Sequence, residues 1–539
     1  MSGDRLIKNS LFSLFNSLFM FVTTWIISIW VARALGPSQY GIFNLVLWFG
    51  GTISWAVGMG LVHAVTKFIA EFQGKNEKQM MLPIILFILK TELLVALPVT
   101  AAMVFLRTHI ADYFFTPSES FYFFLAALGL IPGLLTAIFS AAIEGMQKFE
   151  YFTVSNLIIT PLSFAAKIWV LIQGKGVSGL LTVMVIFSIV NTIFYFIILT
   201  REGLFDKKTW RLQKEVQKRI SGYNRSVLAI ILCDKIVWDK SENYFLGRFC
   251  SASQIGFYNL GFNITQRLTS ILPNTFWSVL FPAMSGLFGS GDREKMKRLF
   301  HLSTRYLAFF SFPMGAAVAV LAFQIVKYLY GAEYSGAHKI IQIIAVASIF
   351  SSLSKPASAV LYGFEKQSFI YKYGSLLAVF NIGLDLLLIK PFGATGAAIC
   401  YGVTTVIASV GGLIYTTRVM KITYPFVSLV KILFSTIIMT LVMEMVIMKD
   451  GSIVGFVLSA SAGLVTYLAC SFSLGTFCQE DYRLLGNVRN MLPGKVKAFA
   501  DILINAIIHL KRSNDVLASQ QQIAESKDAD KEKSEHPVP

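Results

Sequence analysis

The eight residues SQYGIFNL at positions 38–45 return as SQIGFYNL at positions 253–260, with five of eight positions identical. The first copy begins at Ser38 and the second at Ser253. Two shorter pairs repeat at nearly the same spacing: GMQK at 145–148 with GFEK at 363–366, and GVSG at 176–179 with GATG at 393–396. Three matches in the same order at nearly constant offset indicate that the chain is built from two similar halves.

Each half consists mainly of long apolar runs. The chain has 539 residues, of which 55% are hydrophobic and 14% charged, and its mean hydropathy is +0.63. A typical soluble domain carries about 25% charged residues, well above the charged fraction of this chain. Because a membrane-spanning helix needs roughly 20 apolar residues, we expect an all-α integral membrane protein. Fourteen spans are expected, near residues 9–32, 41–66, 82–104, 119–143, 152–173, 177–199, 224–247, 254–288, 300–326, 341–362, 374–389, 394–416, 424–446 and 452–476.

The first apolar run, residues 9–31, is too long for the core of a signal peptide, and no small-residue cleavage pattern precedes Arg33. It is therefore expected to stay as the first helix. The five cysteines lie in or near expected spans without a CxxC motif. This pattern predicts no disulfide framework, no metal site and no cofactor.

The net charge of +17 is unevenly distributed. Lysine and arginine gather on one side of the expected membrane, above all in the loop 201–222 and in the segment after residue 477. By the positive-inside rule this side is cytoplasmic, which places both termini in the cytoplasm and requires an even number of spans. The basic charge is thus a topology signal, and nucleic acid is not expected as a partner.

Six spans in each half give both halves the same orientation, related by a pseudo-twofold axis along the membrane normal, with a substrate path between them. Two independent bundles without a shared cavity are the alternative. The expected domains are an N-lobe at 1–200, a basic cytoplasmic linker at 201–223, a C-lobe at 224–420, two extra helices at 421–476 and a cytoplasmic tail at 477–539. In the tail, residues 496–510 have the spacing of an interfacial amphipathic helix, and the end is expected to be disordered.

Ionisable residues within the expected spans are the candidate functional residues, because each costs about 2.5–3.5 kcal/mol at bilayer depth even on insertion scales. The cations, candidates for contact with a substrate phosphate, are Lys90, Lys167, Lys235, Lys240, Arg267 and Lys355. The carboxylates, candidates for ion coupling or ion pairs, are Glu92, Asp234, Asp239, Glu242 and Asp385. Lipid cannot solvate these groups, so they indicate a polar cavity.

The seventh expected span holds most of these charges. Lys235 and Asp239 are four residues apart and would pair on one helix face, so a self-satisfied ladder of ion pairs remains an alternative to a cavity. Lys167 and Asp385 occupy equivalent places in the two halves. They would either pair with each other or serve their own halves.

Five segments carry a family resemblance: LGPSQYG at 35–41, GFYNL at 256–260, LYGAEY at 329–334, NIGLDLLLI at 381–389 and GATGAA at 393–398. In order and spacing they resemble the Wzx-type oligosaccharide flippases of the multidrug/oligosaccharidyl-lipid/polysaccharide exporter superfamily. The resemblance covers roughly residues 5–476. It implies two six-helix lobes in a V with two further helices beside them, and alternating access that moves a polyprenyl-linked saccharide across the cytoplasmic membrane.

A lipid-linked glycan, membrane lipids, H⁺ or Na⁺, and glycan-assembly proteins are the partners that this resemblance suggests. A cation-coupled drug or metabolite antiporter of the same superfamily is the second hypothesis, and it would depend on the carboxylates Asp234, Asp239 or Asp385. A membrane enzyme such as a polymerase is not favoured, because the outer loops are short and lack paired carboxylates or a His-rich motif. A scaffold without transport does not explain so many interior charges.

Overall fold

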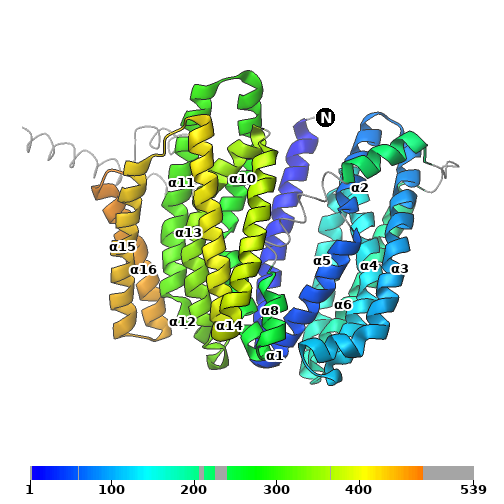
Figure 1. The fold of residues 1–539 in the computed structure, drawn as a ribbon, viewed down its shortest axis with the longest axis horizontal. Helices are drawn as coiled ribbons and strands as arrows, with labels where there is room; N and C mark the ends of the chain where they lie inside the picture. The colour runs from blue at the N-terminus through cyan, green and yellow to red at the C-terminus, as the bar shows by residue number, and fades with distance from the viewer. Residues whose placement is uncertain (1–2, 59, 205–211, 225–239, 365, 477–539) are drawn as a thin grey trace, which may run out of the picture. The chain divides into compact units, whose positions relative to one another are not determined.

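A computed structural model describes residues 3–58, 60–204, 212–224, 240–364 and 366–476. Within these ranges all regular structure is helical, and ten helices are long and apolar enough to cross a membrane, or eleven if one bent pair forms a single span (Figure 1). The all-α membrane fold is therefore confirmed. The count of fourteen spans stays a prediction, since most of the seventh lies outside the described residues.

The helices have the following bounds: α1 Gly3–Gly58, α2 Leu61–Gly74, η1 Lys78–Met80, α3 Met81–Phe114, η2 Pro117–Glu119, α4 Ser120–Gly145, α5 Glu150–Ile172, α6 Gly176–Arg201, α8 Glu242–Phe249, α9 Ala252–Thr269, α10 Ile271–Ser290, α11 Arg293–Val320, α12 Ala322–Leu329, η3 Ala332–Tyr334, α13 Ala337–Gly363, α14 Gln367–Met420, α15 Phe426–Lys449 and α16 Ile453–Ser473.

At two of the expected connections between spans, two helices that carry one label meet at a sharply kinked glycine. The helix α1 turns at Gly36, whose φ is 69°, and α14 turns at Gly393, whose φ is 56°. Glycine adopts this region without steric cost. At the second kink the amide of Ala394 donates to Gln254 Oε1 at 3.0 Å, and a side chain on Gly393 would meet the same oxygen. A glutamine of the repeat motif thus caps the new helix segment.

The prediction of two continuous spans is wrong, because each is interrupted in the structure. The span expected at 41–66 is broken, because α1 ends at Gly58 and α2 begins at Leu61 after Gly60 in the left-handed region. The span expected at 254–288 is broken at Ser270, between α9 and α10. Its Pro273 lies in the first turn of α10, where a missing N–H is tolerated. The second helix of each half is therefore discontinuous.

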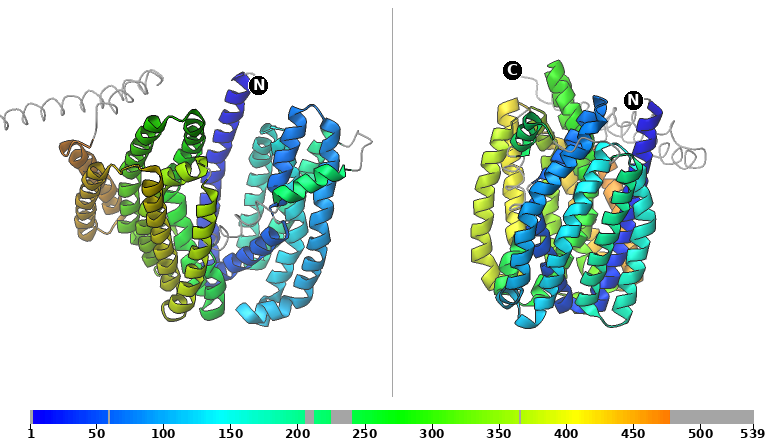
Figure 2. Two further views of the ribbon diagram at one scale, coloured as in Figure 1. Left: turned by 45° about the horizontal axis from the view of Figure 1, so that its top comes forward. Right: turned by 90° about the vertical axis from the view of Figure 1, so that its right-hand side faces the viewer.

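The helices group into two compact units. Unit 1 comprises residues 1–267, 325–347 and 365–411, and unit 2 comprises residues 268–324, 348–364 and 412–539. In unit 1, α3, α4, α5 and α6 form a bundle of roughly parallel axes, with α2 packed on α3 and α4 (Figures 1 and 2). This grouping differs from the division into repeated halves, and the lobe boundaries stay a prediction.

In unit 2, α15 and α16 form an antiparallel pair that packs on α11 (Figure 1). The buried face of α16 carries small residues, including Ser459 and Gly463, against which Met439 and Met443 of α15 lie. The opposite faces expose large apolar side chains such as Met448 and Val465. Exposed apolar faces of this extent fit helices surrounded by lipid.

The described part of the expected linker after α6 is largely helical. Residues 214–224 are helical, and Leu212, Val216 and Ile220 pack into the core of α2, α3 and α4. Arg219 donates to both carboxylate oxygens of Glu71 on α2, at 3.0 and 2.7 Å. The linker is thereby fixed to the N-terminal half. The predicted tail at 477–539 lies outside the described residues.

Candidate functional site

A polar cluster lies inside unit 1, where the start of α8 meets α9 and the first segment of α14. Lys240 has a φ of 56°, and this left-handed residue turns the chain into α8, whose first residue is Glu242. The first turn of a helix presents free N–H groups and favours an anionic side chain. The local chain path therefore places a lysine and a carboxyl group at one helix start.

Two carboxyl groups share this cluster. Asp385 is 0% and Glu242 1% exposed. The Asp385 Oδ2 atom accepts from Ser241 Oγ at 3.5 Å and from Asn381 Nδ2 at 3.3 Å, while its Oδ1 has no hydrogen-bond partner among the described residues. Glu242 lies close to Tyr258 and Asn381, yet neither of its oxygens has a well-formed hydrogen bond there. Three acceptor atoms are thus buried and unsatisfied.

Lys240 is the cation of the cluster. Its Nζ donates to Asn263 Oδ1 at 2.8 Å and to Asn259 Oδ1 at 3.3 Å, and it lies over the ring of Phe262. Asn259 is itself held by Asn243, to whose Oδ1 it donates at 2.7 Å. The cluster thus combines one lysine with two carboxyl groups, and Arg267 lies close enough to that lysine to act on it electrostatically.

Arg267 lies near the end of α9, close enough to Lys240 and Tyr330 to interact with them electrostatically. It is half-buried, and its Nη1 atom is fully enclosed without a hydrogen-bond partner in the described part of the chain. A guanidinium with an unused donor suits a phosphate oxygen. Of the predicted cations, Arg267 and Lys240 are therefore brought together by the structure.

The other described candidates are dispersed. Lys90 is exposed on α3, Lys167 is half-buried on α5, and Lys355 is half-buried on α13 in unit 2. Among the described residues, Lys167 and Asp385 form no ion pair. They are not paired in this structure, and a role for each within its own half stays a prediction.

Glu92 stands apart from every other described charged candidate. Its side chain is 1% exposed in the middle of α3, and neither carboxyl oxygen has a hydrogen-bond partner among the described residues. The predicted site residues Asp234, Lys235 and Asp239 lie outside the described residues, and so does their expected ladder of ion pairs.

Sequence reasoning missed the amides of the cluster. Asn243, Asn259 and Asn381 position the charged groups, with Thr404 Oγ1 donating to Asn381 Oδ1 at 2.7 Å. The sequence could have indicated these asparagines, because an amide at bilayer depth also needs a hydrogen-bond partner. No cluster of three or more His, Cys, Asp or Glu side chains suited to a metal ion occurs in the part of the chain that is described.

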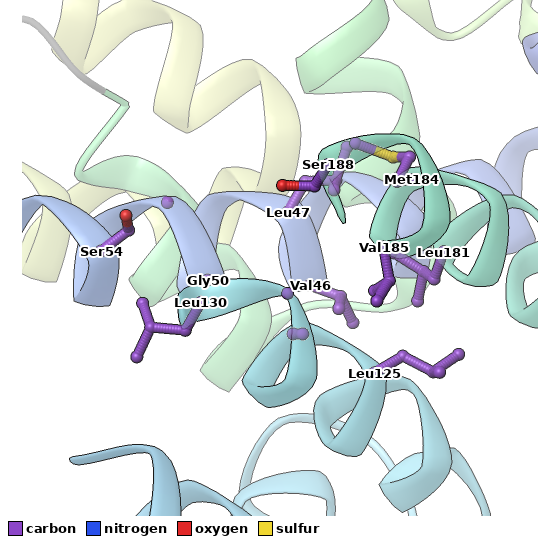
Figure 3. Close-up of a pocket in the computed structure, with 13 residues that line it drawn as sticks. Val46, Leu47, Gly50, Ser54, Leu125, Leu130, Leu181, Met184, Val185 and Ser188 are labelled. Atoms are coloured by element: carbon purple, nitrogen blue, oxygen red, sulfur yellow. The ribbon is translucent and has the colours of Figure 1, made fainter. Parts of the chain in front are cut away.

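A pocket of about 220 Å³ opens in the N-terminal half of unit 1, between the second segment of α1, α4 and α6 (Figure 3). Its lining is apolar apart from the hydroxyls of Ser54 and Ser188, and Gly50 and Gly129 leave room for it. None of the predicted charged residues that the structure describes lines it. The pocket suits an apolar group better than a phosphate.

The first and second halves exchange arginine contacts at one end of unit 1. Arg33, at the end of the first segment of α1, donates to the carbonyl oxygens of Tyr328 and Leu329 at 2.6 and 2.7 Å. Arg248, which is the counterpart of Arg33 at the spacing of the repeated motif, stacks on the ring of Tyr113 at 4.9 Å. Tyr113 and Tyr328 are counterparts at the same spacing. The contacts are therefore reciprocal, as a pseudo-twofold axis requires.

A family model described as a polysaccharide biosynthesis protein matches residues 29–339, more than half of the chain. The chain belongs to this family. A second model, that of the lipid II flippase MurJ, matches residues 242–461. The expected resemblance to polysaccharide flippases of the exporter superfamily is thereby confirmed.

Curated relatives are distant. An uncharacterized membrane protein of Methanocaldococcus jannaschii is 20% identical over 70% of this chain and 76% of its own length. A probable low-salt glycan biosynthesis flippase of Haloferax volcanii, Agl15, is 21% identical over 29% of this chain and 32% of its own length.

Solved structures share the fold of this family member. The lipid II flippase MurJ in an inward closed conformation superposes with a TM-score of 0.69 at 15% identity, covering 87% of this chain and 99% of its own. A multidrug resistance MATE family transporter of the MOP superfamily, in an inward-facing conformation, gives a TM-score of 0.63 at 15% identity, covering 75% and 94%.

Proposed function

We propose that the protein is a flippase, which carries a polyprenyl-linked oligosaccharide across the cytoplasmic membrane by alternating access. The observation that carries this proposal is the match of the polysaccharide biosynthesis family model to residues 29–339. Lipid II, the substrate named for the second matching model, is itself a lipid-linked glycan precursor. The reaction moves a molecule without changing its bonds, so no catalytic residue is assigned.

The substrate joins a phosphate or pyrophosphate, a polar glycan and a long apolar tail. Arg267, with its unpartnered Nη1 within the described residues, is the first candidate for the phosphate, and Lys240 lies close to it. Lys90, Lys167 and Lys355 are further candidates along the path, as is Lys235. Charge reversal at these positions is the direct test, because the bound phosphate would then face a carboxylate.

Transport needs a source of energy, and the cluster of Lys240, Glu242 and Asp385 is our candidate for ion coupling. With the lysine charged, the two carboxylates leave room for one proton or one sodium ion. Binding of that cation would neutralise the buried cluster and favour one conformation over another, since a ligand shifts an equilibrium by its differential affinity.

We further propose that both termini face the cytoplasm, following the distribution of lysine and arginine. The end of unit 1 that contains Arg33 and Arg248 is then extracytoplasmic. Its reciprocal contacts support closure of this end of unit 1 toward the extracytoplasmic side.

The test is flipping of a polyprenyl-pyrophosphate oligosaccharide in proteoliposomes, with and without an imposed proton or sodium gradient. Protection of the glycan from an external reagent only when the protein is present supports the flippase. The gradient arm identifies the coupling ion. Inclusion of Arg267→Glu tests the phosphate site, and we expect it to reduce the flipping rate by at least tenfold.

An antiporter for cationic drugs or metabolites is the second candidate, favoured by the two buried carboxylates and the MATE-like fold. Efflux of small cations from the same proteoliposomes, in the absence of glycan protection, would replace the flippase by this antiporter. Glycan-assembly proteins, the remaining expected partners, are best sought by crosslinking in native membranes.

A further inference from the structure

The carboxyl group of Glu92 has no counter-charge and no hydrogen-bond partner among the described residues. Residues of three helices surround it: Val57 of α1, Ala96 of α3 and Leu134 of α4 belong to one apolar cluster, while Ile88 and Ile138 belong to the next. Both carboxyl oxygens are enclosed and unsatisfied. The described side chains around it therefore offer neither a hydrogen bond nor a cation to an ionised carboxylate.

No ionisable residue in the described parts of the surrounding helices faces Glu92. The stretches packed around it are 51–58 of α1, 61–65 of α2 and 130–138 of α4, and His63 is the one ionisable residue in them. His63 is exposed, as is Lys90 on α3 itself. An isolated carboxylate in such surroundings would cost many kcal/mol, so the group takes up a proton instead.

The carboxyl group also lies at the break in the second helix of the N-terminal half. A Cβ atom built on Gly58, the last residue of α1, would lie 3.8 Å from Glu92 Oε1. The chain then passes through the left-handed Gly60 before α2 starts at Leu61. Backbone groups freed at a break within a membrane need protein partners or water. The end of α1 at Gly58 lies beside the acid.

We propose that Glu92 is a proton-binding site of the N-terminal half, neutral while α1, α3 and α4 pack around it and ionised when water reaches it. Its role in driving transport rests on the proposed function, but the binding of the proton does not. By linkage, a proton that binds the packed arrangement stabilises it, so protonation favours packing around Glu92 and ionisation favours a hydrated arrangement. This site is separate from the cluster of Glu242 and Asp385, which has its own lysine.

Infrared difference spectroscopy of the full-length protein in nanodiscs tests the proton directly. We expect a carbonyl band of a protonated carboxyl at neutral pH that Glu92→Gln removes and Glu92→Asp keeps. Glu144→Gln, at the exposed end of α4, is the matched control and leaves the band unchanged. An identical band in wild type and Glu92→Gln at every pH would overturn the proposal.

Cysteine labelling tests the coupling between ionisation of Glu92 and hydration of the residues around it. Val57→Cys, at a site 3% exposed, is placed in a background with the five native cysteines replaced by serine. Phe121→Cys, at a site that is 50% exposed, is the control, because every thiol reacts faster as it ionises at alkaline pH. We expect Val57→Cys to label at least threefold faster at alkaline than at acidic pH, and Glu92→Gln to remove this dependence. Equal pH dependence with and without Glu92 would overturn the coupling.

Neither measurement requires transport. A wild-type protein that shows the band and the pH-dependent labelling but does not flip glycan would remove the proposed function and leave the proton site. A protein that flips glycan but lacks the band would remove the proton site and leave the proposed function.

Discussion

Gly41 and Gly256 occupy equivalent positions of the repeated motif and pack against each other's helices with no room for a side chain. A Cβ on Gly41 would overlap the carbonyl oxygen of Ala252 and lie 2.9 Å from the amide nitrogen of Gly256. A Cβ on Gly256 would overlap the carbonyl oxygen of Pro37. Since Pro37 and Ala252 are also equivalent positions of the repeat, α1 and α9 make the same contact in both directions.

This crossing predicts that an added methyl group at either glycine separates the two halves. Small residues four positions apart let helix backbones approach closely in a membrane. The carbonyl oxygens that an added methyl group would meet belong to the backbone, which cannot move aside as a side chain can. We expect Gly41→Ala and Gly256→Ala each to destabilise the protein by about 1–3 kcal/mol. Thermal unfolding in detergent measures the loss.

Gly133→Ala on α4 is the control, because a Cβ there meets nothing within 4 Å. Alanine is a better helix former than glycine by up to about 1 kcal/mol, so this variant should be as stable as wild type or more stable. The double variant at Gly41 and Gly256 should lose less than the sum of the single losses, since both act on one interface. A Gly41→Ala protein as stable as Gly133→Ala would contradict the packing.

Removal of the Arg33 side chain should weaken closure of the same end of unit 1. Its guanidinium donates to the carbonyl oxygens of Tyr328 and Leu329 at the end of α12. We expect Arg33→Ala to lower the free energy of unfolding by about 1–2 kcal/mol. Arg33→Lys should lower it by a smaller amount, because an ammonium group cannot make the forked contact. Arg248→Ala should cost less, about 0.5–1 kcal/mol, since it loses only a stacking contact with Tyr113.

The measurement is the thermal midpoint of each variant. We expect the largest decrease for Arg33→Ala, a smaller one for Arg248→Ala and none for the control. Lys339→Ala serves as that control, because Lys339 is exposed near the start of α13 and makes no ion pair or hydrogen bond with described residues. A loss at Lys339 equal to that at Arg33 would show that any cation at this end has the same effect.

Hydropathy and the repeat predict the class of the fold and the equivalence of the halves, but not the breaks. Gly58 to Leu61 contains no charged residue, and the polar stretch TQRLTS at 265–270 is short, so a long hydropathy window passes over both breaks. At Gly36 the expected connection between two spans is present, but it is a single kinked glycine and not a loop. A left-handed glycine followed by a proline joins two helices directly, and only the backbone angles reveal it.

The candidate site was predictable to the extent that charge marks it. Glu242, Asp385 and Lys240 were identified by their depth, and the structure places them in one cluster. The fixing residues Asn259 and Asn381 were missed, because a search for charge ignores amides. The isolation of Glu92 depends on contacts among helices distant in sequence, which no local pattern contains.

The linker clamp predicts a dependence of stability on pH. Arg219 first, and Lys75 second, lower the pKa of Glu71 from 4.5 to about 2. A carboxyl whose pKa is lowered by folding stabilises the protein above its unfolded value, and this contribution is lost as the pH falls from about 4.5 to about 2. Because the ion pair is exposed to solvent, we expect about 0.5–1 kcal/mol from it.

Glu71→Gln should therefore lower the thermal midpoint at neutral pH and converge with wild type as the pH approaches the lowered pKa. Glu294→Gln is the control, since its partner Lys297 lies three residues away on an exposed helix face. A constant difference between Glu71→Gln and wild type down to the lowest pH would mean that Glu71 acts through packing and not through its charge.

The buried cluster predicts that its lysine and its carboxylates depend on one another. Lys240→Met removes the cation beside Glu242 and Asp385, and an uncompensated buried charge costs of the order of 3 kcal/mol. Glu242→Gln alone leaves Lys240 with the carboxylate of Asp385 and should be milder. Combined with Lys240→Met, it should recover part of the lost stability, because one fewer negative charge is then unpaired.

A double-mutant cycle on thermal unfolding measures this coupling, and we expect an interaction of about 1–3 kcal/mol. The same variants separate structure from transport. Asp385→Asn and Glu242→Gln should keep the fold but lose the response of flipping to an imposed ion gradient. Strictly additive losses in the cycle, together with an undiminished gradient response, would show that the three groups do not act as one ion-binding unit.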